Sequence, residues 1–490
     1  MGASINDYSD IQEGMRFLTP ENELPIGSVG KGVLGARGGL LVLHLKGTSY
    51  ERGFQHGSLL ADQIFASFSK EMTKYSLLYG QGNVEAGMKL LRDSTQLMKP
   101  YVTPALRKEI QGIADGAASK DKDITFDDIL LMNCVSNVLL FPHGLADPAA
   151  ATMHEPFSDN CSAFAAWGNA TADGKLIYGK NTDLGVMTMP DFPVVIINEP
   201  QTGYASICPS FPGAVTVASG MNEAGLAVGS NFSGSKNATM RGTPAFFLVR
   251  VILDNAASID DAITILSTFP RQRGMNFIVA DGKAKDAVVV EVSGTELAVR
   301  HGQEDTICAT NHFNCYPGWQ GYSGHNMVPG QAAAYKLNDI STIEKWQESV
   351  KQADPSSFAR YQRLKDLLEG NYGEIDAAKA TSIMSDRFDL LAGRILGWDE
   401  YGYAVCALGH QETIARRVKY YRSGQVGPIT DQHITWSSEV GDPEDLLVWI
   451  AIGNRPAQRG KYILFDLKKE IPSVKYQLEK YYQRSTTQAR

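Results

Sequence analysis

Cysteine is scarce in this chain: six residues in 490 are too few to form a disulfide framework. There is also no run of about 20 apolar residues, the length that a membrane-spanning helix needs. The first forty residues lack the charged-then-apolar layout of a signal peptide, and the myristoylation pattern fails at Asn6. These absences predict a soluble protein without a membrane span and leave its compartment open.

Positive charge is also in short supply. The chain has 46 Lys and Arg against 54 Asp and Glu, a net charge of -8, and no basic run. Nucleic acid and anionic membrane surfaces are therefore not expected as partners. No Gly-x-Ser-x-Gly elbow and no Walker-type lysine loop occurs, so neither motif supplies the chemistry. A hydrophobic content of 43% with 20% charged residues is ordinary for a globular protein.

The first third of the chain divides into three stretches. Residues 1–40 are polar and Gly-rich, and we interpret them as an arm over the surface. Residues 41–140 predict mainly helices, because apolar residues recur there at three-and-four spacing. Gly53 and Gly57 fall in the first turns of one such helix, which indicates close packing against a neighbour. Residues 141–160 are loop-like and suit a linker that is cut.

From residue 161 onward the pattern changes to paired strands. Turn signals at 173–175, 222–225 and 281–283 are each flanked by apolar residues, as hairpins require. Helical stretches are expected at 245–253, 258–266 and 358–368, and late strands at 446–452 and 462–465. This order predicts an α+β protein with antiparallel sheets and helices packed outside them.

Cys161 opens the first of these strands and is the candidate nucleophile. A free α-amino group has a pKa near 7.7–8.0, so a cysteine at a chain start carries its own general base. Within a chain that nitrogen is an amide, so activation requires cleavage between Asn160 and Cys161. The thiol can attack the Asn160 carbonyl and form a thioester that water opens. The alternative interpretation is that Cys161 is a small buried hydrophobe, as most cysteines are.

The residues around Cys161 extend this hypothesis. Cys161-Ser162-Ala163-Phe164 with Gly179-Lys180-Asn181-Thr182-Asp183 resembles the first hairpin of N-terminal-nucleophile (Ntn) hydrolases of the choloylglycine hydrolase and penicillin acylase type. The closer resemblance is to the acyl-CoA:6-aminopenicillanate acyltransferase branch, in which a helical prosegment precedes the cysteine. Gly53-Phe54-Gln55-His56-Gly57 and Gly112-Ile113-Ala114-Asp115-Gly116 look like motifs of that prosegment.

Three further segments follow in the family's order: 222–232, 309–313 and 357–361. The resemblance implies that Cys161 is nucleophile and base and that Asp183 holds its freed amine. It implies further that Asn231 stabilises the oxyanion, Asn311 orients the amine or thiol, and Arg360 supports the charge network. Lys180 stands where relatives often carry arginine or glutamine. It cannot form arginine's bidentate contacts, although a nearby cation would still lower the pKa of the thiol.

The resemblance implies an αββα four-layer sandwich. Residues 1–160 would be a mainly helical prosegment that stays bound as a small subunit, and residues 161–490 the catalytic domain. The expected reaction is hydrolysis or transfer of the acyl group of a small N-acyl amide, without a cofactor. An apolar acyl site is expected at Met187, Phe192 and Phe211.

Other functions remain open from the sequence. A phospholipase-B-like lipid acyl hydrolase or a non-catalytic protein could share the fold. Cys308, His312 and Cys315 have spacing that could suit a metal, but no second pair of ligands follows, and no metal is expected. A papain-like pair of Cys161 with His312 is the other alternative, and it would need no chain cleavage.

Overall fold

The structure is a computed structural model that describes residues 23–471, with gaps at 81, 139–159, 186–188, 236, 315–343, 346, 349–350, 352–354, 401 and 409–432.

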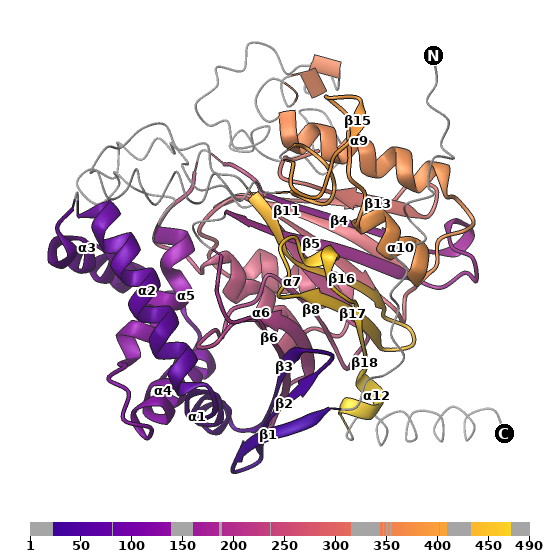
Figure 1. Cartoon of the computed structure of the whole chain (residues 1–490). Coiled ribbons are helices and arrows are strands. Elements are labelled where there is room, and N and C mark those ends of the chain that lie inside the picture. The colour runs from indigo at the N-terminus through magenta and orange to yellow at the C-terminus, as the bar shows by residue number, and fades with distance from the viewer. Residues whose placement is uncertain are drawn as a thin grey trace.

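Two large sheets form its centre (Figure 1). The larger has ten strands in the order β1 (Leu24–Val29), β2 (Gly32–Arg37), β3 (Leu40–Gly47), β6 (Val194–Pro200), β7 (Ser206–Ser210), β8 (Ser219–Asn222), β9 (Leu226–Phe232), β10 (Met275–Asp281), β11 (Asp286–Val292) and β12 (Leu297–His301). The smaller has six, in the order β13 (Thr306–Ala309), β4 (Asn160–Ala166), β5 (Ile177–Gly185), β16 (His433–Asp442), β17 (Leu447–Ile452) and β18 (Ile463–Asp466).

The two sheets pack face to face. One buried apolar cluster takes Ala163 and Tyr178 from the six-stranded sheet and Val195 and Ile278 from the ten-stranded sheet. The two sheets approach closely at Gly229 on β9, where an added Cβ would lie 2.3 Å from the Tyr178 hydroxyl. A side chain at this position would push the sheets apart, so glycine is required there.

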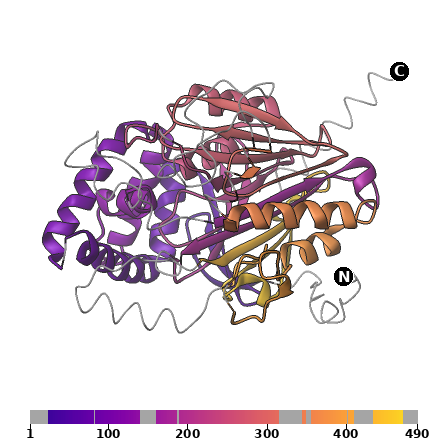
Figure 2. The same cartoon turned by 90° about the horizontal axis from the view of Figure 1, so that it is seen from above.

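Helices cover the outer faces of both sheets. On the ten-stranded sheet they are α6 (Ala245–Asn255) and α7 (Ile259–Thr268), and on the six-stranded sheet α9 (Pro355–Gly370) and α10 (Ala377–Met384). Figure 2 shows α9 and α10, in orange, running along the strands that they cover. Two short strands, β14 (Phe388–Asp389) and β15 (Arg394–Ile395), and helix α12 (Leu467–Glu470) complete this part. The mixed helix and sheet content predicted from the sequence is confirmed.

Five N-terminal helices gather at one side of the molecule (Figure 1): α1 (Ser49–Leu59), α2 (Ala61–Tyr79), α3 (Val84–Met98), α4 (Pro104–Ala118) and α5 (Phe126–Val138). Helices α1 and α4 cross in direct backbone contact. A Cβ at Gly53 would lie 2.0 Å from the Glu109 carbonyl oxygen, and one at Gly57 would lie 2.0 Å from that of Ile113. The close packing predicted from the two α1 glycines is confirmed.

The N-terminal stretch corrects one sequence interpretation. Residues 24–37 are not a surface arm but form the antiparallel hairpin β1–β2, which pairs with β3. β3 in turn pairs with β6 in parallel, the one parallel pairing among the described strands of the two large sheets. The predicted linker 141–160 lies outside the described residues except for Asn160. Within the described residues, none of the helices has the length and apolar character needed to cross a bilayer.

Candidate active site

Cys161 is the second residue of β4 and is 3% exposed. It lies directly opposite Thr182 on β5, and Ala163 lies opposite Lys180. Residues opposite one another in an antiparallel pair share a face of the sheet. Ala163 belongs to the apolar cluster between the two sheets, whereas Phe164 packs beneath α9 and α10. The Cys161 side chain therefore points between the sheets, on the same face as Lys180.

Asn311 binds the nitrogen of the Asn160–Cys161 peptide bond. The Cys161 N–H donates to Asn311 Oδ1 at 2.8 Å, and Asn311 Nδ2 donates to the Phe232 carbonyl at 3.0 Å. The Asn311 backbone N–H donates to Ser357 Oγ at 2.7 Å. These contacts fix the amide of this fully buried side chain, with its oxygen on the peptide nitrogen.

Arg360 joins Asn311 to Cys161, the candidate nucleophile. It lies on α9 and is 1% exposed. Its Nη1 donates to the Cys161 carbonyl at 2.6 Å and to Ser162 Oγ at 3.1 Å. Its Nη2 donates to Asn311 Oδ1 at 2.8 Å. One planar guanidinium thus holds both the carbonyl of Cys161 and the amide that binds its nitrogen.

Asp183 lies directly opposite Asn160, at the other end of the peptide bond in question. Its Oδ1 accepts from Thr435 Oγ1 at 2.7 Å, while its Oδ2 is buried with no hydrogen-bond partner among the described residues. Burial raises the pKa of Asp183 to about 6, although Arg360, the Thr435 hydroxyl and Lys180 oppose that rise. The carboxyl therefore has an oxygen available for a cationic partner beside residue 160.

Lys180 and Asn231 reach the same interior from the two sheets. Lys180 is fully buried, donates to the Asn181 carbonyl at 2.7 Å, and lies against Gly229. Asn231 lies two residues further along β9, which packs against β4. Its Nδ2 donates to the Ala309 carbonyl at 2.8 Å, and its Oδ1 has no partner among the described residues.

The structure thus brings the predicted site residues to one region, with different degrees of contact. Asn311 and Arg360 bind the backbone of Cys161 directly, whereas Asp183 and Lys180 are placed by the β4–β5 register. Asn231 faces them from the ten-stranded sheet.

Sequence reasoning missed several polar residues of this region. Ser357 lies in the segment 357–361, three residues before Arg360, so helical spacing could identify it. Thr435, Glu439 and Ser219 lie on strands β16 and β8, far from Cys161 in the sequence, and no local signal marks them.

The three predicted acyl-site residues differ in their surroundings. Phe211 is partly buried against the cluster between the sheets and packs edge-on against Trp436, with ring centroids 6.5 Å apart. Phe192 is 37% exposed. Met187 lies outside the described residues.

His312 is poorly suited to act as a base for Cys161. Its Nδ1 lies 2.7 Å from Ser357 Oγ, and burial, with Arg300 and Arg360 nearby, lowers its pKa to about 3. The papain-like pairing is therefore not favoured. Of the suggested metal ligands, Cys315 lies outside the described residues.

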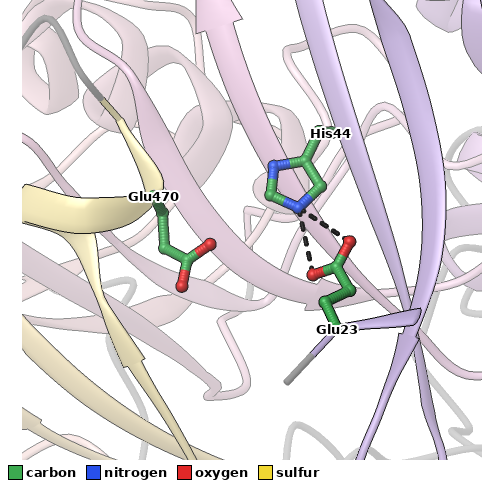
Figure 3. A group of neighbouring side chains, drawn as sticks. All are labelled: Glu23, His44 and Glu470. Atoms are coloured by element: carbon green, nitrogen blue, oxygen red, sulfur yellow. Dashed lines mark hydrogen bonds and ion pairs between the residues drawn. The ribbon is translucent and has the colours of Figure 1, made fainter. Parts of the chain in front are cut away.

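One other group of side chains could suit a metal by its composition: Glu23, His44 on β3 and Glu470 on α12 (Figure 3). A guanidinium already bridges the two carboxylates, since Arg37 donates to Glu470 Oε1 at 2.6 Å and to Glu23 Oε2 at 2.9 Å. His44 Nε2 lies 3.2 Å from Glu23. This group is an ion-pair cluster that joins β2 and β3 to α12.

The family model for acyl-coenzyme A:6-aminopenicillanic acid acyl-transferase matches residues 170–398, just under half of the chain. The match begins shortly after Cys161 and includes Lys180, Asp183, Asn231, Asn311 and Arg360. The resemblance inferred from the motifs is confirmed.

Curated relatives extend the similarity over more of the chain. An uncharacterized protein of Archaeoglobus fulgidus is 26% identical over 356 residues, which cover 71% of this chain and 58% of the relative. Protein dcd1B of Dictyostelium discoideum is 27% identical, covering 51% and 50%, and protein dcd1A is 24% identical, covering 72% and 74%. The chain thus spans only 58% and 50% of the length of the first two.

Solved structures with some likeness include conjugated bile acid hydrolase from Clostridium perfringens, at 16% identity and a TM-score of 0.35. That match covers 63% of this chain and 93% of the hydrolase. Penicillin V acylase from Agrobacterium tumefaciens matches at 15% identity and a TM-score of 0.31, covering 60% and 84%. These scores are too low to carry a fold or a substrate over to this chain.

Proposed function

We propose that this chain is a self-cleaving cysteine Ntn hydrolase or acyltransferase of the αββα type that acts on small N-acyl amides. The observation that carries the proposal is the hold on Cys161: Asn311 binds its nitrogen, and Arg360 binds both its carbonyl and Asn311. A structural cysteine in a strand needs neither contact, because its backbone groups would pair with neighbouring strands.

In the first stage, Cys161 Sγ attacks the carbonyl carbon of Asn160. The C–N bond breaks, a thioester forms, and the nitrogen held by Asn311 takes up the thiol proton to become an amine. Water then opens the thioester, which leaves a carboxylate on Asn160 and a free thiol. We expect Asp183 to hold the new ammonium group, since it has one unpartnered oxygen beside residue 160.

In the second stage, the amine of Cys161 serves as base for its own thiol. The thiolate attacks the acyl carbon of the substrate and expels its amine, and water or another amine accepts the acyl group. Asn231 is the side-chain candidate for stabilising the oxyanion, a contribution typically of about 2.7–4 kcal/mol per donor.

After cleavage, residues 1–160 would stay bound to residues 161–490. Three contacts favour this: the β3–β6 pairing, the buried Glu109 carboxylate held by Arg250 at 3.0 Å, and Asn133 on α5. Asn133 donates to the Gly213 carbonyl and accepts from the Val215 N–H. The small subunit would thus support the loop that follows Phe211.

Intact-mass spectrometry of the purified protein tests the proposal. Division of the 53.4 kDa chain after residue 160 gives pieces of about 17 and about 36 kDa. Cys161→Ala should stay uncut and inactive, whereas Cys161→Ser should cut slowly. A wild-type chain that remains whole while it turns over an N-acyl amide would contradict self-cleavage.

Two other outcomes would point to the alternative functions. Release of fatty acid from phospholipid, but not from N-acyl amino acids, would favour a lipid acyl hydrolase. An intact chain whose Cys161 does not react with iodoacetamide would favour a non-catalytic protein.

A further inference from the structure

Two pairs of residues face each other between the sheets, beside the candidate nucleophile. Lys180 on β5 and Glu439 on β16 are direct partners in the six-stranded sheet, so their side chains leave it on the same face. Ser219 on β8 and Gly229 on β9 are direct partners in the ten-stranded sheet. The pairs meet because Ser219 Oγ donates to Glu439 Oε1, and Gly229 lies against the Lys180 side chain.

The opposite charges of Lys180 and Glu439 offset part of the free-energy cost of burying each of them. Lys180 is 0% exposed and Glu439 is 1% exposed, and an unpaired buried charge is strongly destabilising. The Lys180 ammonium donates to a neutral group, the Asn181 carbonyl, at 2.7 Å. Glu439, the direct partner of Lys180 across the two strands, supplies a negative charge beside it.

The protonation of Glu439 is sensitive to these surroundings. Burial raises its pKa to about 7, while the Ser219 hydroxyl and Lys180 favour its charged form. The other titratable groups that sense its charge are Tyr178 on β5 and Cys208 on β7, and in both it adds to the effect of burial in raising the pKa. Glu439 therefore titrates within the range in which a cysteine nucleophile works.

Lys180 is also a neighbour of Cys161. Cys161 lies opposite Thr182, and Lys180 is two residues further along β5 on the same face. Such diagonal neighbours have Cα atoms about 7–8 Å apart, within reach of a long side chain. The same cation thus has a carboxyl group on one side and the candidate nucleophile on the other.

We propose that Glu439, held by Ser219, is a positioning residue that fixes Lys180 and balances its charge, and so sets how readily the Cys161 thiol gives up its proton. The inference rests on the proposed role of Cys161 as nucleophile. It adds a residue for which the sequence motifs gave no signal, and it makes Lys180 the element through which that residue acts.

The test is the pH dependence of iodoacetamide alkylation, followed by mass spectrometry of the peptide that contains Cys161. Glu439→Gln keeps the shape of the side chain but removes its charge, so no carboxylate offsets the charge of Lys180. The midpoint, the pH at which half of the Cys161 thiol reacts, should therefore fall by about one unit. Coulomb's law gives that size for one charge at roughly 10 Å with an effective dielectric constant of about 20. Asp281→Asn, which neutralises a buried carboxyl at the far end of β10, should leave the midpoint unchanged.

A second background tests whether the effect of Glu439 depends on Lys180. In Lys180→Gln the carboxyl loses its cation and should stay protonated, and glutamine resembles a protonated glutamate. Glu439→Gln should then shift nothing in that background. An equal shift in both backgrounds, or no shift in the wild-type background, would overturn the proposal.

Ser219→Ala provides an independent variant if Glu439→Gln fails to fold. Loss of the hydroxyl favours the protonated carboxyl, so the midpoint should move in the same direction by a smaller amount. A midpoint that stays in place or moves upward would contradict the proposal. Alkylation requires neither turnover nor chain cleavage, so these outcomes are distinct from failure of the proposed function, provided that intact mass shows the same processing state in each variant.

Discussion

Among single residues, Arg360 connects the most parts of the candidate site. Its two terminal nitrogens bind the Cys161 carbonyl and Asn311 Oδ1, and its Nε lies 3.3 Å from Ser356 Oγ. This use of the planar, forked guanidinium cannot be reproduced by the single ammonium group of lysine. The identity of the cation therefore matters at residue 360 beyond its charge.

Arg360→Lys should slow both self-cleavage and turnover by about 10- to 100-fold. That range corresponds to the loss of one hydrogen bond to a charged group, about 1.5–3 kcal/mol. Gel densitometry of the uncut chain over time and a turnover assay measure the two rates. The matched control is Arg363→Lys, one turn further along α9, where arginine pairs with Asp386. Equal losses in the two variants would contradict the assignment.

Asp183 gives a prediction about stability and pH. Its pKa in the folded chain, about 6, lies above the ordinary value of 3.8, so the folded state binds the proton more tightly than the unfolded state. The stabilisation from this proton is fully present below pH 3.8 and is lost as the pH rises through about 6. The ionised carboxyl therefore opposes folding at neutral pH.

Asp183→Asn should accordingly gain stability relative to the parent as the pH rises through about 6, by up to about 3 kcal/mol. Thermal melts over this pH range measure the difference, in a Cys161→Ala background that we expect to remain uncut. Melting curves whose separation does not change with pH would refute this account of Asp183.

At the scale of elements, the crossing of α1 and α4 depends on glycine. Gly57→Ala would place a methyl group 2.0 Å from the Ile113 carbonyl oxygen, and backbone cannot move aside cheaply. Overpacking of this kind typically costs about 1–3 kcal/mol. The melting temperature should fall, as differential scanning calorimetry would show.

Gly370→Ala is the matched control, because this helical glycine at the end of α9 has nothing within 4 Å of an added Cβ. It should leave the melting temperature unchanged or raise it slightly, since alanine favours helix. A similar drop in both variants would mean that the contact between α1 and α4 is not responsible.

The elements that the sequence predicted well are those with local signals. Ser258 caps α7 by accepting from the Asp261 N–H, and Thr125 pairs with Asp128 at the start of α5. The turns at 222–225 and 281–283 join the predicted strands. In contrast, β1 and β2 carry glycine at 27, 32 and 35, and their composition gives no clear strand signal. They become strands by pairing with each other and with β3.

The residues of the candidate site also divide into those with a local sequence signal and those without one. Cys161, Lys180 and Asp183 share one hairpin, and Asn311 and Arg360 lie in short recognisable motifs, so their positions could be predicted. Glu439 could not, because its partners Lys180 and Ser219 are brought to it only by strand register and sheet packing.

For the whole molecule, the contacts between residues before and after the predicted cut are extensive and partly charged. Burial would raise the pKa of Glu109, but Arg250 and Arg52 hold it at about 2. Arg250 also donates to the Val215 carbonyl at 3.2 Å and to Asp254 at 2.9 Å. A carboxylate from α4 thus satisfies an arginine from α6 in the protein interior.

We expect the two pieces of processed protein to elute together in gel filtration and to separate only in denaturant. Arg250→Met leaves the Glu109 charge without one of its two cations, and breaking a buried pair costs about 3–5 kcal/mol. The pieces should then separate at a lower guanidinium concentration. Arg241→Met, at an exposed arginine, should not change that concentration. Elution of the wild-type pieces as separate peaks would exclude a bound small subunit.

The parallel pairing of β3 with β6 has a practical consequence for making the protein. Without residues 24–47, β6 would be left with a row of bare N–H and C=O groups along a long, apolar strand, the type of edge that recruits other chains. A gene for residues 161–490 alone should therefore yield aggregates. Co-expression with residues 1–160 would restore solubility by capping that edge.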